Sequence, residues 1–168
     1  MTNSTPLVCV MGVSAAGKST VGAALAGVLG VPFADADDLH SDANRSKMAS
    51  GIPLGDEDRW PWLDAVGGHF QEHRATGLVM ACSALRRVYR DRIRAVAPDV
   101  VFVHLDGSRE LLAARAAART DHFMPAALLN SQIATLEPLA ADERGLVADV
   151  GMPVSDLVDD VAARLSSA

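Results

Sequence analysis

Residues 7–30 read LVCVMGVSAAGKSTVGAALAGVLG, and this stretch decides the fold. It begins with a short apolar run, 7–12, that predicts a buried β-strand. Residues 12–19, GVSAAGKS, then match the pattern G-x-x-x-x-G-K-[ST] of a phosphate-binding loop. Apolar residues recur at helical spacing up to Gly30, where Val31-Pro32 marks the end of a helix. A strand, a glycine-rich loop and a helix in this order predict a nucleotide-binding site.

The chemistry of the loop follows from its residue types. Glycines let the backbone turn so that successive N–H groups face a phosphate, and the next helix adds the positive end of its dipole. Lys18 is expected to reach the β- and γ-phosphates, and the Ser19 hydroxyl to ligate Mg²⁺. The predicted nucleotide-binding residues of the loop are Gly12, Val13, Ser14, Ala15, Ala16, Gly17, Lys18, Ser19 and Thr20.

Beyond the loop, strand-like and helix-like segments alternate along the chain. The further predicted strands are 32–37, 78–83, 100–105 and 145–150, and the further predicted helices are 60–74, 85–96, 108–119 and 154–165. The polar stretch between them, 38–59, carries glycine and proline breakers and predicts an irregular segment. Strands that are apolar throughout are typical of a parallel sheet covered on both faces. We therefore predict one α/β domain over residues 1–168, a P-loop NTPase three-layer αβα sandwich with a five-stranded parallel sheet and a helical lid.

Residues 33–40, FADADDLH, place carboxylates where a polyanion is expected. Asp35 and Asp37 are two residues apart on a predicted strand, so they share one face at the strand's carboxyl end, where ligands bind in open α/β sheets. A Mg²⁺ ion between them and the phosphates would remove the repulsion. We predict a metal-side role for Asp35, and for Asp37 a role in orienting an acceptor hydroxyl and taking its proton. The alternative, a carboxylate that caps the next helix, is assigned to Asp38.

Composition excludes several classes of protein. The chain has 168 residues and a net charge of −6 without a basic run, so a nucleic-acid binder is not expected. Neither a signal peptide nor a membrane span is recognised in it. Cys9 and Cys82 lie in apolar runs, which indicates two buried thiols in a reducing compartment. Together these features predict a cytoplasmic protein.

The chain resembles the bacterial gluconate kinases (gluconokinases), small P-loop kinases related in fold to shikimate kinase and the nucleoside monophosphate kinases. The matching stretches are GVSAAGKST (12–20), DADDLHSDANRSKMASGIPLGDEDRWPWL (35–63), CSALRRVYRDRIR (82–94) and HFMPAALLNSQIATLE (122–137). The second is the most specific, because other small P-loop kinases lack it. The resemblance implies that ATP, with Mg²⁺, phosphorylates D-gluconate at its 6-hydroxyl in a homodimeric enzyme of carbohydrate-acid catabolism, feeding the pentose phosphate or Entner–Doudoroff routes.

Gluconate is a linear polyol with one carboxylate, so its site needs cations and many hydrogen-bonding groups. A substrate-binding insert at about 38–75 is expected to supply them, and the resemblance makes Asp37 the residue that accepts the proton of the 6-hydroxyl. The expected substrate-binding residues are Asp37, His40, Asn44, Lys47, Arg59, Arg86 and His122. Alternatives stay open: Arg59 could pair with Asp56–Asp58, Arg86 could be exposed on its basic helix, and His40 could be an ordinary loop residue. Outside this set, Arg87, Arg90, Arg92 and Arg94 are predicted to form a solvated face, and His104 to be a core histidine.

Related kinases carry a lid whose arginines fold over ATP, and here the lid is expected at about 119–137. Arg115 and Arg119 are four residues apart and lie on one helical face before it. By this resemblance both bind ATP, and Lys18, Asp37 and Arg119 are the catalytic residues. Closure would deliver a cation to the transferring phosphoryl group and expel water. The adenine contacts are expected from Arg115 and the loop at 151–153; the alternative is two ordinary surface arginines.

Two other functions fit the same motifs. The first is a P-loop kinase for another small hydroxy acid, such as shikimate, against which residues 40–63 argue. The second is a nucleotide-dependent switch that binds ATP and phosphorylates nothing small. A switch would have no use for the combination of Asp37, Arg59 and Arg86, which favours the kinase.

Overall fold

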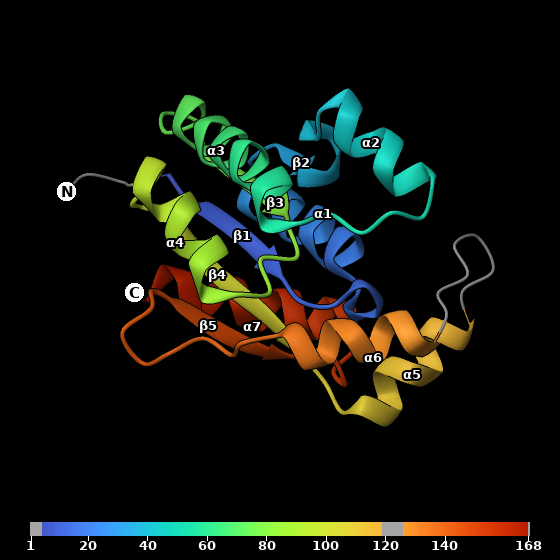
Figure 1. The fold of residues 1–168 in the computed structure, drawn as a ribbon. Coiled ribbons are helices and arrows are strands. Elements are labelled where there is room, and N and C mark those ends of the chain that lie inside the picture. Colours follow the sequence, from blue (N-terminus) through green and yellow to red (C-terminus); the bar gives the residue numbers. More distant parts are fainter. Residues whose placement is uncertain (1–4, 119–125, 168) are drawn as a thin grey trace.

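The computed structural model describes residues 5–118 and 126–167, and its centre is one five-stranded sheet (Figure 1). Neighbouring strands are all parallel, in the order β2-β3-β1-β4-β5. The strands are β1 (Leu7–Met11), β2 (Phe33–Asp35), β3 (Leu78–Ala81), β4 (Val101–Asp106) and β5 (Gly145–Asp149). The predicted five-stranded parallel sheet is thus confirmed.

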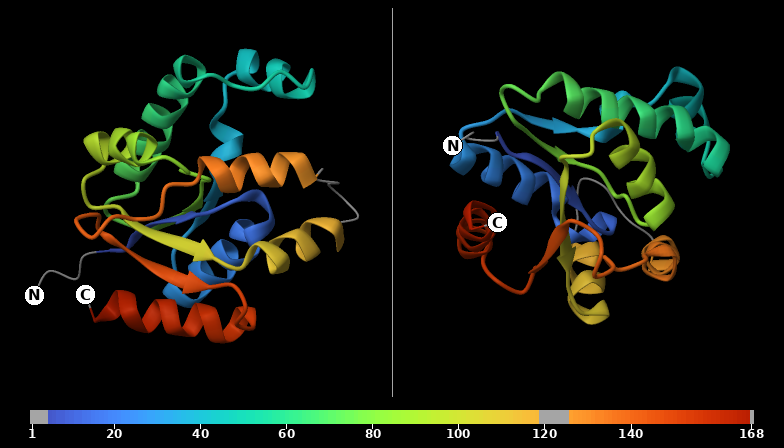
Figure 2. Two further views of the ribbon diagram at one scale, coloured as in Figure 1. Left: turned by 60° about the horizontal axis from the view of Figure 1, so that its bottom comes forward. Right: turned by 90° about the vertical axis from the view of Figure 1, so that its left-hand side faces the viewer.

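Helices cover both faces of this sheet (Figure 2). They are α1 (Lys18–Leu29), α2 (Asp42–Ala49), α3 (Asp56–Glu72), α4 (Arg87–Val96), α5 (Arg109–Ala118), α6 (Ala126–Thr135) and α7 (Val154–Ser166). Two 3-10 turns, η1 (Ser14–Ala16) and η2 (Ala36–Leu39), follow β1 and β2. None of the helices described by the structure is both long and apolar enough to cross a membrane.

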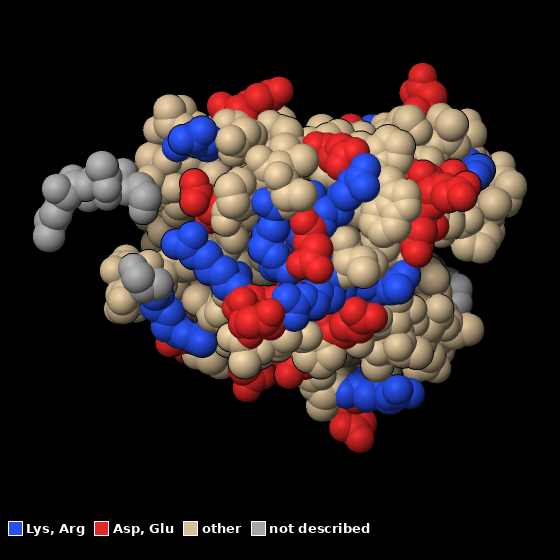
Figure 3. Space-filling model, turned by 60° about the vertical axis from the view of Figure 1, so that its left-hand side comes forward, with Lys and Arg blue, Asp and Glu red and all other residues tan. Residues whose placement is uncertain are grey.

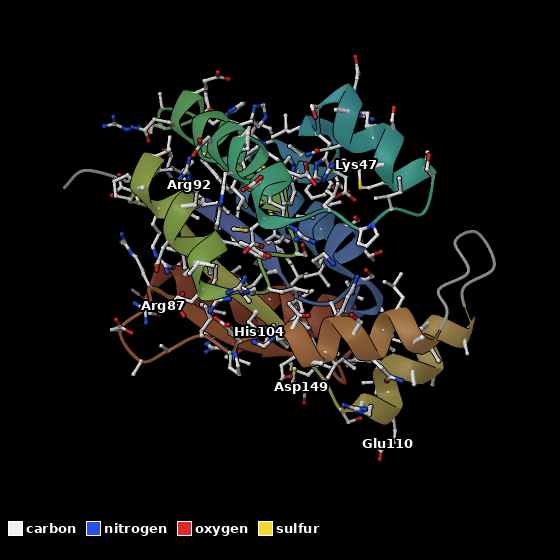
Figure 4. All side chains as sticks on the ribbon, viewed as in Figure 1. Lys47, Arg87, Arg92, His104, Glu110 and Asp149 are labelled. Carbon is white, nitrogen blue, oxygen red and sulfur yellow. The ribbon has the colours of Figure 1, made fainter. Side chains whose placement is uncertain are left out.

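The alternation of side chains along β1 explains the three layers. Val8 and Val10 point into a core formed with α1, α5, α6 and α7, whereas Cys9 and Met11 point into a second core formed with α3 and α4. All five residues of β1 are buried. A strand that is apolar throughout therefore has a hydrophobic layer on each side, as expected for a parallel sheet. His104 on β4 is buried as well, which confirms its prediction as a core histidine (Figure 4).

Two segments differ from the sequence-based expectation. Residues 38–59 were predicted to be irregular, but they contain α2, whose start is capped by the Ser41 hydroxyl accepting a hydrogen bond from the Asn44 N–H. The helix predicted at 60–74 begins earlier, at Asp56, so Pro61 lies in its second turn. A polar helix held by its cap and its neighbours lacks the apolar periodicity that sequence patterns detect.

The basic helix α4 corrects another prediction. Arg87 and Arg92 do lie in solvent, where they pair with Asp142 and Asp64 at 2.7 Å (Figure 4), and acidic and basic side chains alternate across this face (Figure 3). Arg90, however, is fully buried, and its Nε and Nη2 donate to the two carboxylate oxygens of Glu143 at 2.7 and 3.0 Å. The prediction of a solvated face is therefore wrong for Arg90, and Arg94 departs from it too, because its side chain is only 18% exposed and donates to the same Glu143.

Replacing Arg90 by methionine should lower the free energy of unfolding by about 3–5 kcal/mol, because it leaves a buried carboxylate without its main partner. Urea unfolding would measure the loss. The matched control is Arg87→Ala, which breaks an exposed pair on the same helix and should change the unfolding midpoint little. An equal loss in both variants would show that burial of the Arg90 pair does not matter.

The same pair predicts a pH dependence. Burial raises the pKa of Glu143, but hydrogen bonds from Arg90, from the Ala140 N–H and from Arg94 outweigh it and hold this pKa at about 2 instead of 4.5. A carboxylate whose pKa is lower in the folded state stabilises the protein above its unfolded pKa, and that stabilisation is lost as the pH falls from about 4.5 towards 2. Wild-type stability should fall more steeply across this window than that of Arg90→Met.

Candidate active site

The phosphate loop lies between the end of β1 and the start of α1. Gly12 has a φ of +148° and passes so close to β4 that a Cβ atom there would meet the Leu105 carbonyl at 3.1 Å. Gly17, with a φ of +88°, turns the chain into α1. Lys18, the first residue of that helix, reaches back over the loop, and its Nζ donates to the Val13 carbonyl at 3.1 Å. Backbone N–H groups, the helix dipole and an ammonium group thus gather around one turn.

Two side chains that could ligate a metal through oxygen lie in contact beside this loop. The Ser19 hydroxyl donates to Asp35 Oδ2 at 3.2 Å. Mg²⁺ prefers oxygen ligands and often takes only one or two of them from the protein, the others coming from water and phosphate. The residues predicted as metal ligands, Ser19 and Asp35, could therefore hold Mg²⁺ together.

Asp37 lies on η2 just beyond β2, not on the strand as its spacing from Asp35 suggested. Its backbone N–H donates to Asp35 Oδ1 at 2.9 Å, which bends the chain directly after the strand. Burial against its surroundings and, second, the charge of Asp35 raise the pKa of Asp37, although its side chain still reaches solvent. A carboxylate of this kind can accept a proton from a hydroxyl beside the phosphate loop.

A cavity of about 510 Å³ has lining residues that hydrogen-bond to the segments carrying these groups. The side chain of Trp62 lines it and donates from Nε1 to the Ala36 carbonyl at 2.7 Å, one residue before Asp37. Ser83 lines it as well, and its carbonyl accepts from the Gly12 N–H of the phosphate loop at 3.2 Å. The lining residues are Arg59, Trp62, Ser83, Leu85, Arg86, Tyr89, Ala134, Thr135 and Glu137. We call this space the acceptor cavity.

Arg59 and Arg86, both predicted to bind substrate, reach the acceptor cavity together. Their guanidinium carbons lie 5.4 Å from the centre of the Tyr89 ring. Asp56 holds the group: one oxygen accepts from Arg86 Nη1 at 3.0 Å and the other from the Tyr89 hydroxyl at 2.6 Å. The hydrogen bond from Tyr89, followed by the charge of Arg86, lowers the pKa of Asp56 against the effect of burial.

The alternatives for these two arginines were an ion pair with Asp56–Asp58 for Arg59 and an exposed position on the helix for Arg86. Arg59 Nη1 does approach Asp56 at 3.8 Å, but it also donates to the Leu54 carbonyl at 2.8 Å and lines the acceptor cavity. Arg86 is the residue before α4, and its half-buried side chain lines the cavity and pairs with Asp56.

Three other predicted substrate residues lie outside the lining of the acceptor cavity. His40 is buried and stacks on Trp62 at 4.2 Å, and burial lowers its pKa. The Asn44 amide lies 3.3 Å from His40 Nδ1 and donates to the Asp58 carbonyl at 2.9 Å. Lys47 pairs with the Asp58 carboxylate at 2.9 Å. In this structure these residues fasten α2 to the start of α3, and direct contact with a substrate stays a prediction.

A second, smaller cavity of about 190 Å³ flanks the phosphate loop on the other side. Gly17 and Thr20 of the loop line it together with Arg115 and Met152. Arg115 Nη2 donates to the Val150 carbonyl at 2.6 Å, which joins α5 to the loop after β5. The residues predicted to surround adenine are thus neighbours in space.

The predicted lid is only partly described. Arg119 and His122 lie outside the described residues. The described part is α6, from which Gln132 Oε1 accepts hydrogen bonds from the N–H and the hydroxyl of Ser14, at 2.8 and 2.9 Å. This helix therefore touches the phosphate loop directly.

Sequence patterns missed several residues of this site. They share no motif of their own, although all lie within stretches that carry the family resemblance: Tyr89, Gln132 and Glu137. Asp56 was named only as an ion-pair partner of Arg59. Only that resemblance could have drawn attention to them.

Comparison with known proteins assigns the family. The shikimate kinase family model matches residues 14–156. The chain is 45% identical over 141 residues to the thermosensitive gluconokinase of Escherichia coli K12, covering 82% of this chain and 75% of that protein. It is 48% identical over 136 residues to a gluconokinase of Gluconobacter oxydans, covering 80% and 76%.

Solved structures agree with this assignment. The crystal structure of a gluconokinase from Sinorhizobium meliloti superposes with a TM-score of 0.86 at 45% identity, covering 96% of this chain and 94% of that one. An APS kinase from Mycobacterium tuberculosis, at 17% identity and a TM-score of 0.69, shares the fold (97% and 98% coverage). The P-loop kinase fold and the resemblance predicted from the sequence are confirmed. The chain therefore belongs to the gluconokinases within the shikimate kinase family.

Proposed function

We propose that this protein is a gluconokinase that transfers the γ-phosphoryl group of ATP to the 6-hydroxyl of D-gluconate. Membership of the gluconokinases supports the reaction, and one observation in this chain supports the substrate. Arg59, Arg86 and Tyr89 line a cavity whose wall is hydrogen-bonded to the phosphate loop through Ser83 and to the residue before Asp37 through Trp62. A volume of about 510 Å³ lies in the ordinary range for small-molecule sites. Two guanidinium groups suit a carboxylate.

Each residue has a separate task in this proposal. The loop N–H groups and Lys18 bind the phosphates, and Arg59 and Arg86 hold the gluconate carboxylate at the far end of the acceptor cavity. Asp37 orients the 6-hydroxyl toward the γ-phosphorus and takes its proton as the new P–O bond forms and the bond to the ADP oxygen breaks. Ser19 and Asp35 would hold Mg²⁺, which neutralises phosphate charge when bound.

The lid residues complete the proposal. Arg115 borders the smaller cavity, where the adenosine part of ATP would lie. Arg119 is assigned to the transferring phosphoryl group and His122 to gluconate, both by resemblance to related kinases. Resemblance also supports a homodimer, and composition supports a cytoplasmic location.

A coupled assay of ADP release tests the function. The purified protein with MgATP should release ADP rapidly with D-gluconate and at background rate with shikimate or without an acceptor. The product should carry a phosphate whose ³¹P signal couples to two protons on C6. Faster turnover with another hydroxy acid would move the activity to that acceptor. Calorimetry with gluconate distinguishes the kinase from a nucleotide switch, because a switch should give no heat of gluconate binding.

A further inference from the structure

We propose that Glu137 makes the acceptor cavity specific for 2-hydroxy acids over 2-oxo acids, by accepting a hydrogen bond from the hydroxyl next to the substrate carboxylate. The inference rests on the proposed function, because it takes Arg59 and Arg86 as the carboxylate anchors. It adds a residue that specifies the chemical class of the acceptor at its carboxylate end.

Glu137 is held rigidly on the cavity wall. Its backbone N–H donates to the Leu85 carbonyl at 2.7 Å. Its Oε1 accepts from the N–H of Arg87, the first residue of α4, at 2.9 Å. The residue before that helix, Arg86, provides no side-chain cap of its own, so Glu137 caps α4 from a segment 50 residues away. One oxygen is therefore committed to the cap, which restrains the orientation of the carboxylate.

The second oxygen keeps its acceptor capacity. Glu137 Oε2 lies 3.7 Å from Arg86 Nε, which is an ion-pair distance but longer than a hydrogen bond. Half of the Glu137 side chain is exposed, and the residue lines the acceptor cavity. An ionised carboxylate accepts hydrogen bonds and donates none. This oxygen therefore favours a ligand hydroxyl and disfavours a ligand carbonyl.

The groups around Arg86 determine which hydroxyl of the ligand lies close to Glu137 Oε2. Asp56 occupies Arg86 Nη1 on one side, and Glu137 flanks Nε on the other. A substrate carboxylate that pairs with Arg86 then binds between these two acidic groups. Both oxygens of Asp56 already accept hydrogen bonds, whereas Glu137 Oε2 does not, so we place the neighbouring carbon, C2, on the Glu137 side. Two carboxylates side by side repel each other, and a hydroxyl on C2 that donates to Oε2 offsets this repulsion. A 2-oxo group has no proton to donate and adds a second repulsive oxygen.

The test compares D-gluconate with 2-keto-D-gluconate, whose open-chain form has the same 6-hydroxyl. The keto acid also closes to cyclic hemiketals, so the decisive quantity is the change in the kcat/KM ratio between wild type and variant, in which the open-chain fraction cancels. In Glu137→Gln the amide can donate to a carbonyl and can still accept from the Arg87 N–H, so the preference for gluconate should fall by about 10- to 100-fold relative to wild type, the usual range for one hydrogen bond to a charged group. The matched control is Asp142→Asn, which removes one negative charge from the same segment outside the cavity and should leave the ratio unchanged.

The outcomes are distinct. Wild type that does not phosphorylate gluconate would refute the proposed function itself. The role of Glu137 would be refuted if the wild type phosphorylates gluconate but Glu137→Gln leaves the ratio unchanged. It would also be refuted if this variant raises KM equally for both acids, and Glu137 would then only cap α4. A measurement without any variant adds a check: 2-deoxy-D-gluconate should show a raised KM in the wild type, and a KM equal to that of gluconate would also overturn the inference.

Discussion

Lys18→Ala is expected to lower kcat by a factor of about 10³ or more, because under the proposed function it removes the ammonium group that binds the phosphates where negative charge develops during transfer. The structure places this side chain at the start of α1, folded back over the phosphate loop with Nζ 3.1 Å from the Val13 carbonyl. The residues that line the acceptor cavity are untouched by this change, so gluconate should bind as before. The ADP-release assay measures kcat, and calorimetry measures gluconate affinity.

The chain offers a matched control for this variant. Arg164, an exposed cation near the end of α7, pairs with Asp160 and lines neither cavity, so Arg164→Ala should retain most of the turnover. Lys18→Arg should also be strongly impaired, since a planar guanidinium does not replace a compact ammonium group. Near-normal turnover in Lys18→Ala would mean that residues 12–19 do not serve as the phosphate site.

Asp37→Asn is expected to reduce kcat by about 10²–10⁴, the usual contribution of a general base, while MgATP still binds. Asparagine keeps the shape of the side chain and can still orient a hydroxyl, but it does not take the proton. The bend after β2 depends on the Asp37 backbone N–H and on Asp35, so it should persist in the variant. Rate measurements should be paired with a binding titration of MgATP on the same preparation.

Asp38→Asn is the control, because it makes the same chemical change one residue further along η2. It should behave nearly as wild type. If Asp37→Asn instead lost its affinity for MgATP and kept its turnover per bound nucleotide, Asp37 would be a metal-side ligand and the acceptor's base would lie elsewhere. Asp35→Asn, by contrast, is expected to weaken MgATP, since this carboxylate contacts the Ser19 hydroxyl.

Local patterns predicted those parts of the fold that are local in origin. The phosphate loop, the apolar strands and the helix after the loop follow from neighbouring residues, because turn geometry and side-chain alternation act over a few positions. The helix α2 was not predicted, because its polar sequence has no apolar face. Its cap is a single hydrogen bond to the Ser41 side chain, which is too weak a signal by itself. The 3-10 turn that carries Asp37 was not predicted either, because its bend depends on a hydrogen bond to one side chain, that of Asp35.

The burial and the partners of charged residues could not be predicted from local patterns. Arg90 and Arg87 are both basic residues of α4, yet one is buried against Glu143 and the other lies in solvent. Arg86 meets Asp56 across 30 positions of the chain. Partners so far apart in sequence are brought together by packing of the sheet and its helices, and nothing in the residue types alone ranks one arginine above another.

By itself the sequence determined the parallel α/β fold, the phosphate loop with Lys18 and Ser19, and the acidic pair beside it, because each of these is built from consecutive residues. The family resemblance had already named Arg59 and Arg86, but the tertiary structure alone decided that Tyr89 and Glu137 line the same cavity and that Lys47 and His40 contact the neighbouring helices instead. The physical reason is that electrostatic and hydrogen-bond energies depend on separation in space, and that separation exists only once the chain has packed.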